Sequence, residues 1–151
     1  MTRLKTPLIR MLAALAIPAA LIPAAQAAPL TFTVENVEAR GGTLYVGVQT
    51  RDQFMEWDGI AGQQIDNPTA GTHSITFDLP EGEYSLSAWH DFDGNGRFDT
   101  LADGSPLDGW AMANSGKLRG MPTFDVVKVD LPAYGAEATE SLTYPAPPRT
   151  Q

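Results

Sequence analysis

Residues 75–90 read ITFDLPEGEYSLSAWH, and this stretch decides the fold class. Apolar and polar residues alternate on both sides of a short Pro80-Glu81-Gly82 segment. A period of two places every second side chain on the same face, which is typical of a strand with one buried side. Proline and glycine between two such segments favour a turn. We therefore predict strands over 75–79 and 84–90 with a tight turn between them.

The same alternation recurs on both sides of this stretch, over residues 30–35, 44–49, 127–131 and, more weakly, 142–144. We expect the first two of these segments to pair as a hairpin, because Arg40-Gly41-Gly42 supplies a turn between them. No long segment has the helical period of 3.6 residues. Six or seven short strands without long helices predict an all-β fold, and specifically an antiparallel β-sandwich.

Three connections stand out between these strands. Thr50 and Gln53 have the spacing of a capping box, which predicts one helical turn over 52–57 with Phe54 and Trp57 over an open end of the core. We expect a loop from there to residue 70. A longer loop, rich in Gly and Asp, is predicted from Asp91 to Ser115.

The N-terminal segment has the organisation of an export signal. Its first ten residues carry three basic and no acidic side chains, an apolar run follows over 11–22, and small residues precede Ala27. We expect cleavage after Ala27. The apolar run is shorter than the roughly 20 residues that span a bilayer. The predicted organisation is therefore a signal peptide over 1–27, a single sandwich domain over 28–144, and a disordered Pro-rich tail over 145–151.

Charge and cysteine content limit the partners and the compartment. The chain has 10 basic and 18 acidic residues and a net charge of −8. Loss of residues 1–27 removes three basic groups, which leaves 7 basic against 18 acidic residues and a net charge of −11. Such a surface repels nucleic acid and anionic lipid but attracts divalent cations. With no cysteine, the fold forms without disulfides. We expect a periplasmic or secreted protein with no membrane span after cleavage.

The chemically explicit feature is the loop HDFDGNGRFD at residues 90–99. If Asp91 is taken as the first position, oxygen donors follow at the spacing of an EF-hand calcium loop, with a central glycine for the turn. These donors are the side chains of Asp91, Asp93, Asn95 and Asp99 and the carbonyl of Arg97.

The match to an EF-hand ends at the twelfth position, where Ala102 replaces the bidentate glutamate. Asp103 or Asp108 would have to close the ligand shell. We therefore predict a partial Ca²⁺ loop of modest affinity that acts as a structural clip. The alternative is a solvated turn without an ion, since Asp, Asn and Gly are also common turn residues.

Together with GSPLDGWAMAN at 104–114 and MPTFDVV at 121–127, this loop resembles the exported bacterial family known as domain of unknown function twenty-one forty-one. The family motif runs His-Asp-x-Asn-Gly-Asn-Gly-x-x-Asp, then Gly-x-Pro-x-Glu-Gly-Tyr and Pro-x-Phe. The likeness covers residues 30–132, and the departures are Asp93 for Asn, Asp108 for Glu, Trp110 for Tyr and Ala111 for Gly. The resemblance implies a transthyretin-like or immunoglobulin-like sandwich and no established activity.

Two classes of function fit these residues. We expect a binding or interaction module for an envelope protein or a glycan, and the alternative is a small metal-dependent hydrolase that uses His90 and Asp91. His90 would then be a base or a zinc ligand, but only His73 could join it, and zinc needs three or four nitrogen or sulfur ligands. A buried His90 that orients the loop favours the module, whereas a pocket at His90 and Asp91 favours the hydrolase.

The tryptophans Trp57, Trp89 and Trp110 are the candidate ligand contacts. Indole rings stack on sugar rings and other flat ligands, although they also fill the core and rim of ordinary sandwiches. Trp110 lies in the predicted long loop, where binding residues concentrate on rigid scaffolds.

Overall fold

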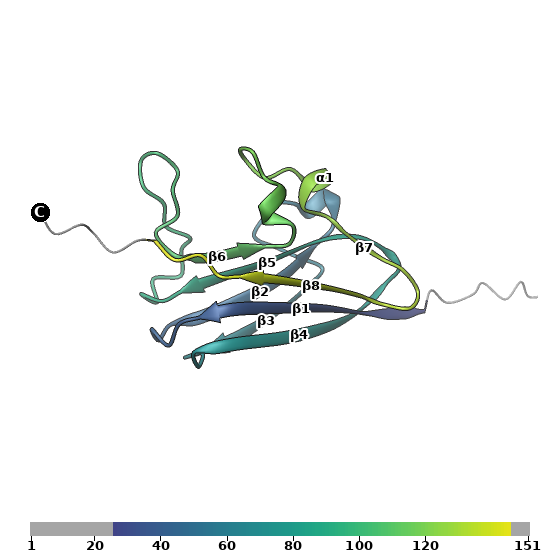
Figure 1. The fold of residues 1–151 in the computed structure, drawn as a ribbon, viewed down its shortest axis with the longest axis horizontal. Helices are drawn as coiled ribbons and strands as arrows, with labels where there is room; N and C mark the ends of the chain where they lie inside the picture. Colours follow the sequence, from purple (N-terminus) through teal and green to yellow (C-terminus); the bar gives the residue numbers. More distant parts are fainter. Residues whose placement is uncertain (1–25, 146–151) are drawn as a thin grey trace, which may run out of the picture.

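The computed structural model describes residues 26–145, which form eight β-strands and three short helical segments (Figure 1). The strands are β1 Ala27–Val37, β2 Thr43–Gln49, β3 Ala61–Asp66, β4 Gly71–Pro80, β5 Gly82–Asp91, β6 Gly109–Met112, β7 Val129–Leu131 and β8 Ala136–Ser141. The helical segments are η1 Arg51–Gln53, η2 Ser115–Lys117 and α1 Phe124–Val127.

The strands form two sheets that lie face to face (Figure 1). One sheet has the order β4-β1-β8, and the other has the order β3-β2-β5-β6 with β7 paired to the beginning of β5. Every pairing is antiparallel except that of β1 with β8, which is parallel. The predicted all-β sandwich is confirmed, with this one parallel pair as an addition.

The predicted hairpin between the first two strands is wrong, because β1 and β2 belong to different sheets. β1 pairs with β4 and β8, whereas β2 pairs with β3 and β5. Both strands have an alternating apolar face, but alternation indicates which side of a strand is buried and carries no information about its neighbour. The turn at Pro80–Gly82 is another such crossing, since it leads from β4 in one sheet to β5 in the other.

The crossing from β1 to β2 requires a glycine at position 42. Gly42 has a φ of +67°, and a Cβ there would lie 1.9 Å from the backbone oxygen of Asp91. Only glycine adopts this conformation readily and tolerates the approach. The connection therefore packs directly against the end of β5, where the acidic loop begins.

The core lies between the sheets and consists of the inward-facing residues of the alternating strands. β1 contributes Leu30, Phe32 and Val34, and the other strands add Leu44, Val46, Val48, Ile75, Phe77, Leu79, Tyr84, Leu86 and Ala88. Leu142, just after β8, is also buried. Burial of these apolar side chains is the dominant stabilising contribution, at about 25 cal/mol per Å² removed from water.

The last two predicted strands are shifted: β7 is shorter than the predicted 127–131 because Val127 ends α1, and β8 covers 136–141 instead of 142–144. Two further strands lie where loops were predicted. β3 falls in the expected loop up to residue 70, and its residues are mostly exposed because it is an edge strand, so it lacks the alternating signal. β6 falls in the expected loop from Asp91 to Ser115 and is only four residues long. The capping box is confirmed, since Gln53 Oε1 accepts a hydrogen bond of 3.3 Å from the N–H of Thr50, but the helical segment that it begins is η1 at Arg51–Gln53 instead of 52–57.

Residues 1–25 of the predicted signal peptide and residues 146–151 of the predicted Pro-rich tail lie outside the described residues, so both stay predictions. β1 begins at Ala27, and Ala28, the first residue after the predicted cleavage, is buried and pairs with Leu79. Within residues 26–145, no helix has the length and apolarity needed to cross a membrane.

Candidate functional site

The acidic loop begins at Asp91, the last residue of β5, and folds around its side chain. Asp91 Oδ1 accepts hydrogen bonds from the N–H groups of Gly94 and Asn95, at 2.9 and 3.2 Å, and Oδ2 accepts one from Gly96 at 2.9 Å. Gly94 and Gly96 have φ values of +72° and +73°. These left-handed conformations, which favour glycine, turn the backbone so that the loop wraps a buried carboxylate.

A second carboxylate, Asp108, reaches the same place from the start of β6. A bridge between Thr100 and Pro106 folds the intervening segment back on itself. Asp108 is buried, and its Oδ2 accepts hydrogen bonds of 3.0 Å from Trp89 Nε1 and from the N–H of Asp99. This back-folded segment therefore brings the two ends of the long loop together.

Three carboxylates converge as a result. Ligand oxygens of Asp91, Asp93 and Asp108 all lie within 4.8 Å of one another. Burial raises the pKa of Asp108 and the nearby Asp93 and Asp91 raise it further, although its two hydrogen bonds oppose this shift. In the part of the chain that the structure describes, none of the three forms a salt bridge. The cluster has the oxygen donors that hard divalent cations prefer.

The other predicted ligands lie around this cluster or away from it. Asn95 Nδ2 donates to Asp93 Oδ2 at 3.0 Å and also to Asp99 Oδ2, so the amide links these two carboxylates. The N–H of Arg97 donates to Asn95 Oδ1. Asp103 instead accepts the N–H of Ser105, which lowers the pKa of Asp103.

The structure therefore joins Asp91, Asp93 and Asp108 directly and links Asn95 and Asp99 to them through hydrogen bonds. Asp103 is not part of the group. Of the two residues that sequence reasoning offered to close the shell, Asp108 lies in the cluster.

His90 is fully buried and both of its ring nitrogens are paired. Nε2 lies 2.8 Å from the carbonyl oxygen of Gly41, and Nδ1 lies 2.6 Å from the hydroxyl of Tyr144. Because a carbonyl can only accept, we assign the proton to Nε2, so Nδ1 accepts from the tyrosine. Tyr144 in turn accepts the N–H of Glu38, and its burial raises its pKa. His90 thus fixes the end of β5 to the β1–β2 connection.

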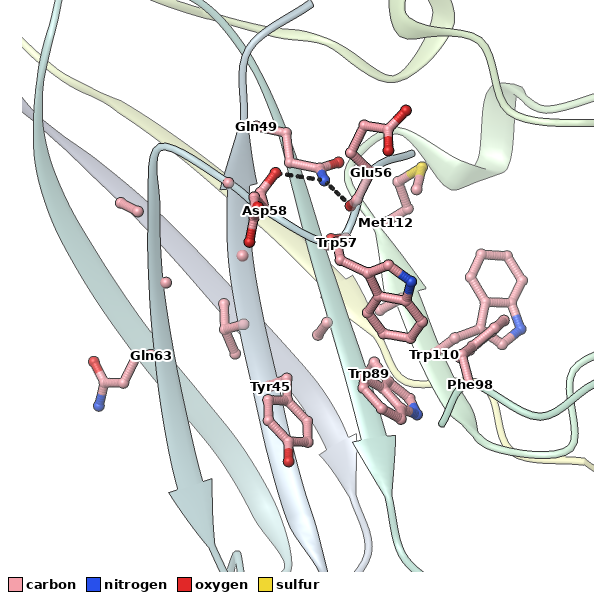
Figure 2. Close-up of a pocket in the computed structure, with 18 of the residues that line it drawn as sticks. Tyr45, Gln49, Glu56, Trp57, Asp58, Gln63, Trp89, Phe98, Trp110 and Met112 are labelled. Atoms are coloured by element: carbon pink, nitrogen blue, oxygen red, sulfur yellow. Dashed lines mark hydrogen bonds between the residues drawn. The ribbon is translucent and has the colours of Figure 1, made fainter. Parts of the chain in front are cut away.

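A groove of about 720 Å³ lies on the outer face of the β3-β2-β5-β6 sheet (Figure 2). Its aromatic lining is Tyr45 from β2, Trp89 from β5, Trp110 from β6, Trp57 from the segment after η1, and Phe98 from the acidic loop. Two placements correct the sequence expectations. Trp57 lies against Trp89 on the outer face instead of over the core, and Trp110 lies on a strand instead of in a loop.

The rings contact one another around Trp89. Tyr45 and Trp89 stack with centroids 4.7 Å apart and planes at 18°, while Trp57 and Phe98 meet Trp89 edge-on at 5.8 and 6.1 Å. Trp89 also donates its Nε1–H to Asp108. The hydrogen bond from Trp89 to Asp108 therefore links the aromatic groove to the acidic cluster, and Phe98 belongs to the loop that carries Asp91 and Asp93.

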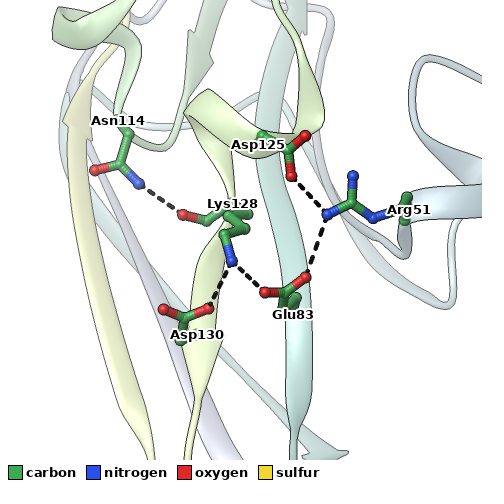
Figure 3. Close-up of polar contacts among 6 residues, drawn as sticks. All are labelled: Arg51, Glu83, Asn114, Asp125, Lys128 and Asp130. Atoms are coloured by element: carbon green, nitrogen blue, oxygen red, sulfur yellow. Dashed lines mark hydrogen bonds and ion pairs between the residues drawn. The ribbon is translucent and has the colours of Figure 1, made fainter.

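Ion pairs that sequence reasoning did not find anchor the segment that carries Trp57 (Figure 3). Arg51 in η1 contacts Asp125 in α1 at 2.6 Å and Glu83 in β5 at 3.4 Å, and Lys128 also pairs with Glu83. These exposed pairs each contribute little to stability. Their geometric effect is to hold η1 and α1 against β5, with the Arg51 guanidinium 4.5 Å from the Phe124 ring centroid.

Comparisons with known proteins identify a family but no activity. A family model described as an uncharacterized protein conserved in bacteria (DUF2141) matches residues 32–139. No curated protein and no solved structure matches the chain.

Proposed function

The chain belongs to the DUF2141 family of uncharacterized bacterial proteins, and we propose that it is an exported binding module whose loop between β5 and β6 is stabilised by Ca²⁺. The observation that carries the proposal is the convergence of Asp91, Asp93 and Asp108 within 4.8 Å beside the aromatic groove. A metal bound there would hold the loop that carries Phe98 and the carboxylate that fixes Trp89.

The choice of Ca²⁺ follows from the donor set. The three converging ligands are all carboxylates, two of them buried, and Asn95 supplies an amide beside them. Hard cations prefer oxygen donors, and zinc or copper sites recruit nitrogen or sulfur. Mg²⁺ demands a tight octahedral shell and releases its waters reluctantly, so an irregular loop suits Ca²⁺ better.

The surroundings of His90 favour a binding module over the alternative hydrolase. A general base must reach its substrate through an accessible nitrogen. Both nitrogens of His90 are paired with Gly41 and Tyr144, and the ring is fully buried. The groove lining includes neither His90 nor Asp91. These contacts support an orienting role for His90, which holds β5 where the acidic loop begins.

Export and partners complete the proposal. The basic, apolar and small-residue segments that precede Ala28 support cleavage and release to the periplasm or beyond. The excess of acidic residues argues against nucleic acid as a partner. A glycan or an envelope protein remains the proposed partner. Mass spectrometry of the exported protein should find Ala28 at the N-terminus, and a chain that retains Met1 would contradict the export proposal.

Calorimetric titration of the mature protein with Ca²⁺ tests the metal proposal directly. We expect a single site with a Kd of about 10⁻⁴ to 10⁻³ M and much weaker binding of Mg²⁺. Asp93→Asn should weaken Ca²⁺ binding at least about tenfold, because it removes one of three charges from the cluster while preserving the side-chain shape.

Asp78→Asn is the matched control for Asp93→Asn. Asp78 is exposed on β4 in the opposite sheet, so the same chemical change there should leave the titration unchanged. Absence of Ca²⁺ binding to the wild-type protein at about 10 mM, far above this range of Kd, would reject the proposal.

A further inference from the structure

We propose that the aromatic groove is a binding site for an uncharged oligosaccharide. This inference deepens the proposed binding function and rests on it, but it does not require the metal. The groove is lined by strands of one sheet and by two loops, so its rings are held on a rigid support. The ligand class follows from the rings, the polar groups beside them and the charge of the lining.

The rings present apolar surface that the fold itself does not bury. Trp57 is 76% exposed, and Tyr45, Trp89 and Trp110 are half-buried on the outer face of the sheet (Figure 2). A contiguous exposed apolar surface of this kind is typical of a ligand-binding or interaction site. The C–H face of a pyranose ring is flat and apolar, and it packs on an indole ring while its hydroxyls stay hydrated.

Polar side chains at the edge of the groove fit the hydroxyl groups of such a ligand. Gln64 is the cross-strand neighbour of Tyr45 and is exposed, and Ser87 lies on β5 between β2 and β6. Glu56 and Asp58 flank Trp57. Amides and hydroxyls both donate and accept, and carboxylates accept, so together they match alternating hydroxyl donors and acceptors.

The charge of the lining narrows the occupant. Its charged side chains are Glu56 and Asp58, with no lysine, arginine or histidine among the lining residues. An anionic ligand would be repelled, and so would a second copy of this chain, whose net charge is −8 and becomes −11 after loss of residues 1–27. The volume of about 720 Å³ falls within the range of small-ligand sites and leaves room for several sugar rings.

Titration of the mature protein with three soluble uncharged hexasaccharides, followed by tryptophan fluorescence and calorimetry, tests the assignment. The probes are cellohexaose, N-acetylated chitohexaose and mannohexaose, and hexagalacturonate is the anionic comparison. We expect at least one uncharged probe to bind and hexagalacturonate not to bind. Trp57→Ala should weaken sugar binding about tenfold, because it removes one stacking face.

Tyr134→Ala is the matched control, because Tyr134 is 89% exposed and is absent from the groove lining. It should leave sugar affinity unchanged. Three results would overturn the sugar assignment. None of the three uncharged probes binds, both variants lose affinity equally, or the groove selectively captures a proline-rich peptide. The same titrations in Ca²⁺ and in EDTA separate the sugar proposal from the metal proposal. Sugar binding in EDTA depends on the groove alone, because the metal has been removed.

Discussion

Replacement of Asp108 by asparagine should leave the metal-free protein at least as stable but should weaken its stabilisation by Ca²⁺. The substitution preserves the shape of the side chain and an oxygen that can accept from Trp89 and from the N–H of Asp99. It removes the negative charge that faces Asp91 and Asp93. In the metal-free protein that charge is unfavourable, because burial and its acidic neighbours raise the pKa of Asp108.

The expected magnitudes follow from the spacing of the cluster. Two carboxylates at the cluster limit of 4.8 Å repel by about 3.5 kcal/mol at an effective dielectric constant of about 20, and by about 0.9 kcal/mol in water. Two hydrogen bonds to a charged acceptor weaken by about 1 kcal/mol each when the acceptor becomes neutral. Asp108→Asn should therefore leave the metal-free protein equally stable or more stable, by about 1 kcal/mol.

In Ca²⁺ the variant loses about 1 kcal/mol of ion stabilisation relative to the wild type, which cancels or outweighs its gain in the metal-free protein. With a Kd of about 0.1 mM, about 1 mM ion stabilises the wild-type fold by about 1.4 kcal/mol, which is a rise in Tm of several degrees. If Asp108→Asn weakens binding about tenfold, the ion contributes only about 0.4 kcal/mol. Thermal unfolding in EDTA and in Ca²⁺ measures both effects. Asp108→Asn that lowers Tm strongly in EDTA, or retains the full Ca²⁺ shift, would refute this reasoning.

Three further predictions concern the same end of the sandwich. The pKa of Asp108 is raised in the native state, so in EDTA the native state binds the Asp108 proton more tightly than the unfolded state does. The contribution of Asp108 to stability therefore falls as pH rises from about 4 through the raised pKa. The Tm advantage of Asp108→Asn should grow over this range and vanish at lower pH. His90→Phe should lower the free energy of unfolding, measured in urea, by about 2–4 kcal/mol, because the Tyr144 hydroxyl and the carbonyl of Gly41 lose their hydrogen-bond partner. A loss below about 1 kcal/mol would contradict the assigned contacts. Gly42→Ala should destabilise the fold by more than about 2 kcal/mol, because the new Cβ would meet the backbone of Asp91. Gly94→Ala has a similar φ but open space around its Cβ, so it should cost about 1 kcal/mol. Equal losses of stability would show that backbone strain alone, without the contact at position 42, sets the cost.

The alternation of apolar residues was sufficient to predict the fold class but insufficient to predict the arrangement of strands. Leu30 and Leu44 both lie on buried faces as expected, yet their strands sit in opposite sheets. Burial depends on one strand's own sequence, whereas pairing depends on contacts with distant strands. The edge strand β3 was missed for the related reason that it buries too little to alternate.

The candidate site was predictable where its residues are close in sequence. Asp91 and Asp93 were identified from the spacing of one loop, and Asp108 was only one of two options because a back-folded segment separates it from them. The hydrogen bond from Trp89 to Asp108 had no sequence signal, since it depends on the meeting of β5 and β6. The sequence likewise indicated three separate tryptophans as candidate ligand contacts, but it did not predict that they line one groove.

The parallel pairing of β1 with β8 has a consequence for the order of folding. Leu30 lies opposite Ala136, and Asn36 donates to the carbonyl of Leu142 across a separation of 106 residues. Closing a loop of that length costs about 4 kcal/mol of chain entropy, against about 2 kcal/mol for the pairing of Val48 with Ala61. Contacts so distant in sequence make folding slow. The first strand thus gains its second neighbour only after the last strand has been synthesised, so an incomplete chain stays open along that edge.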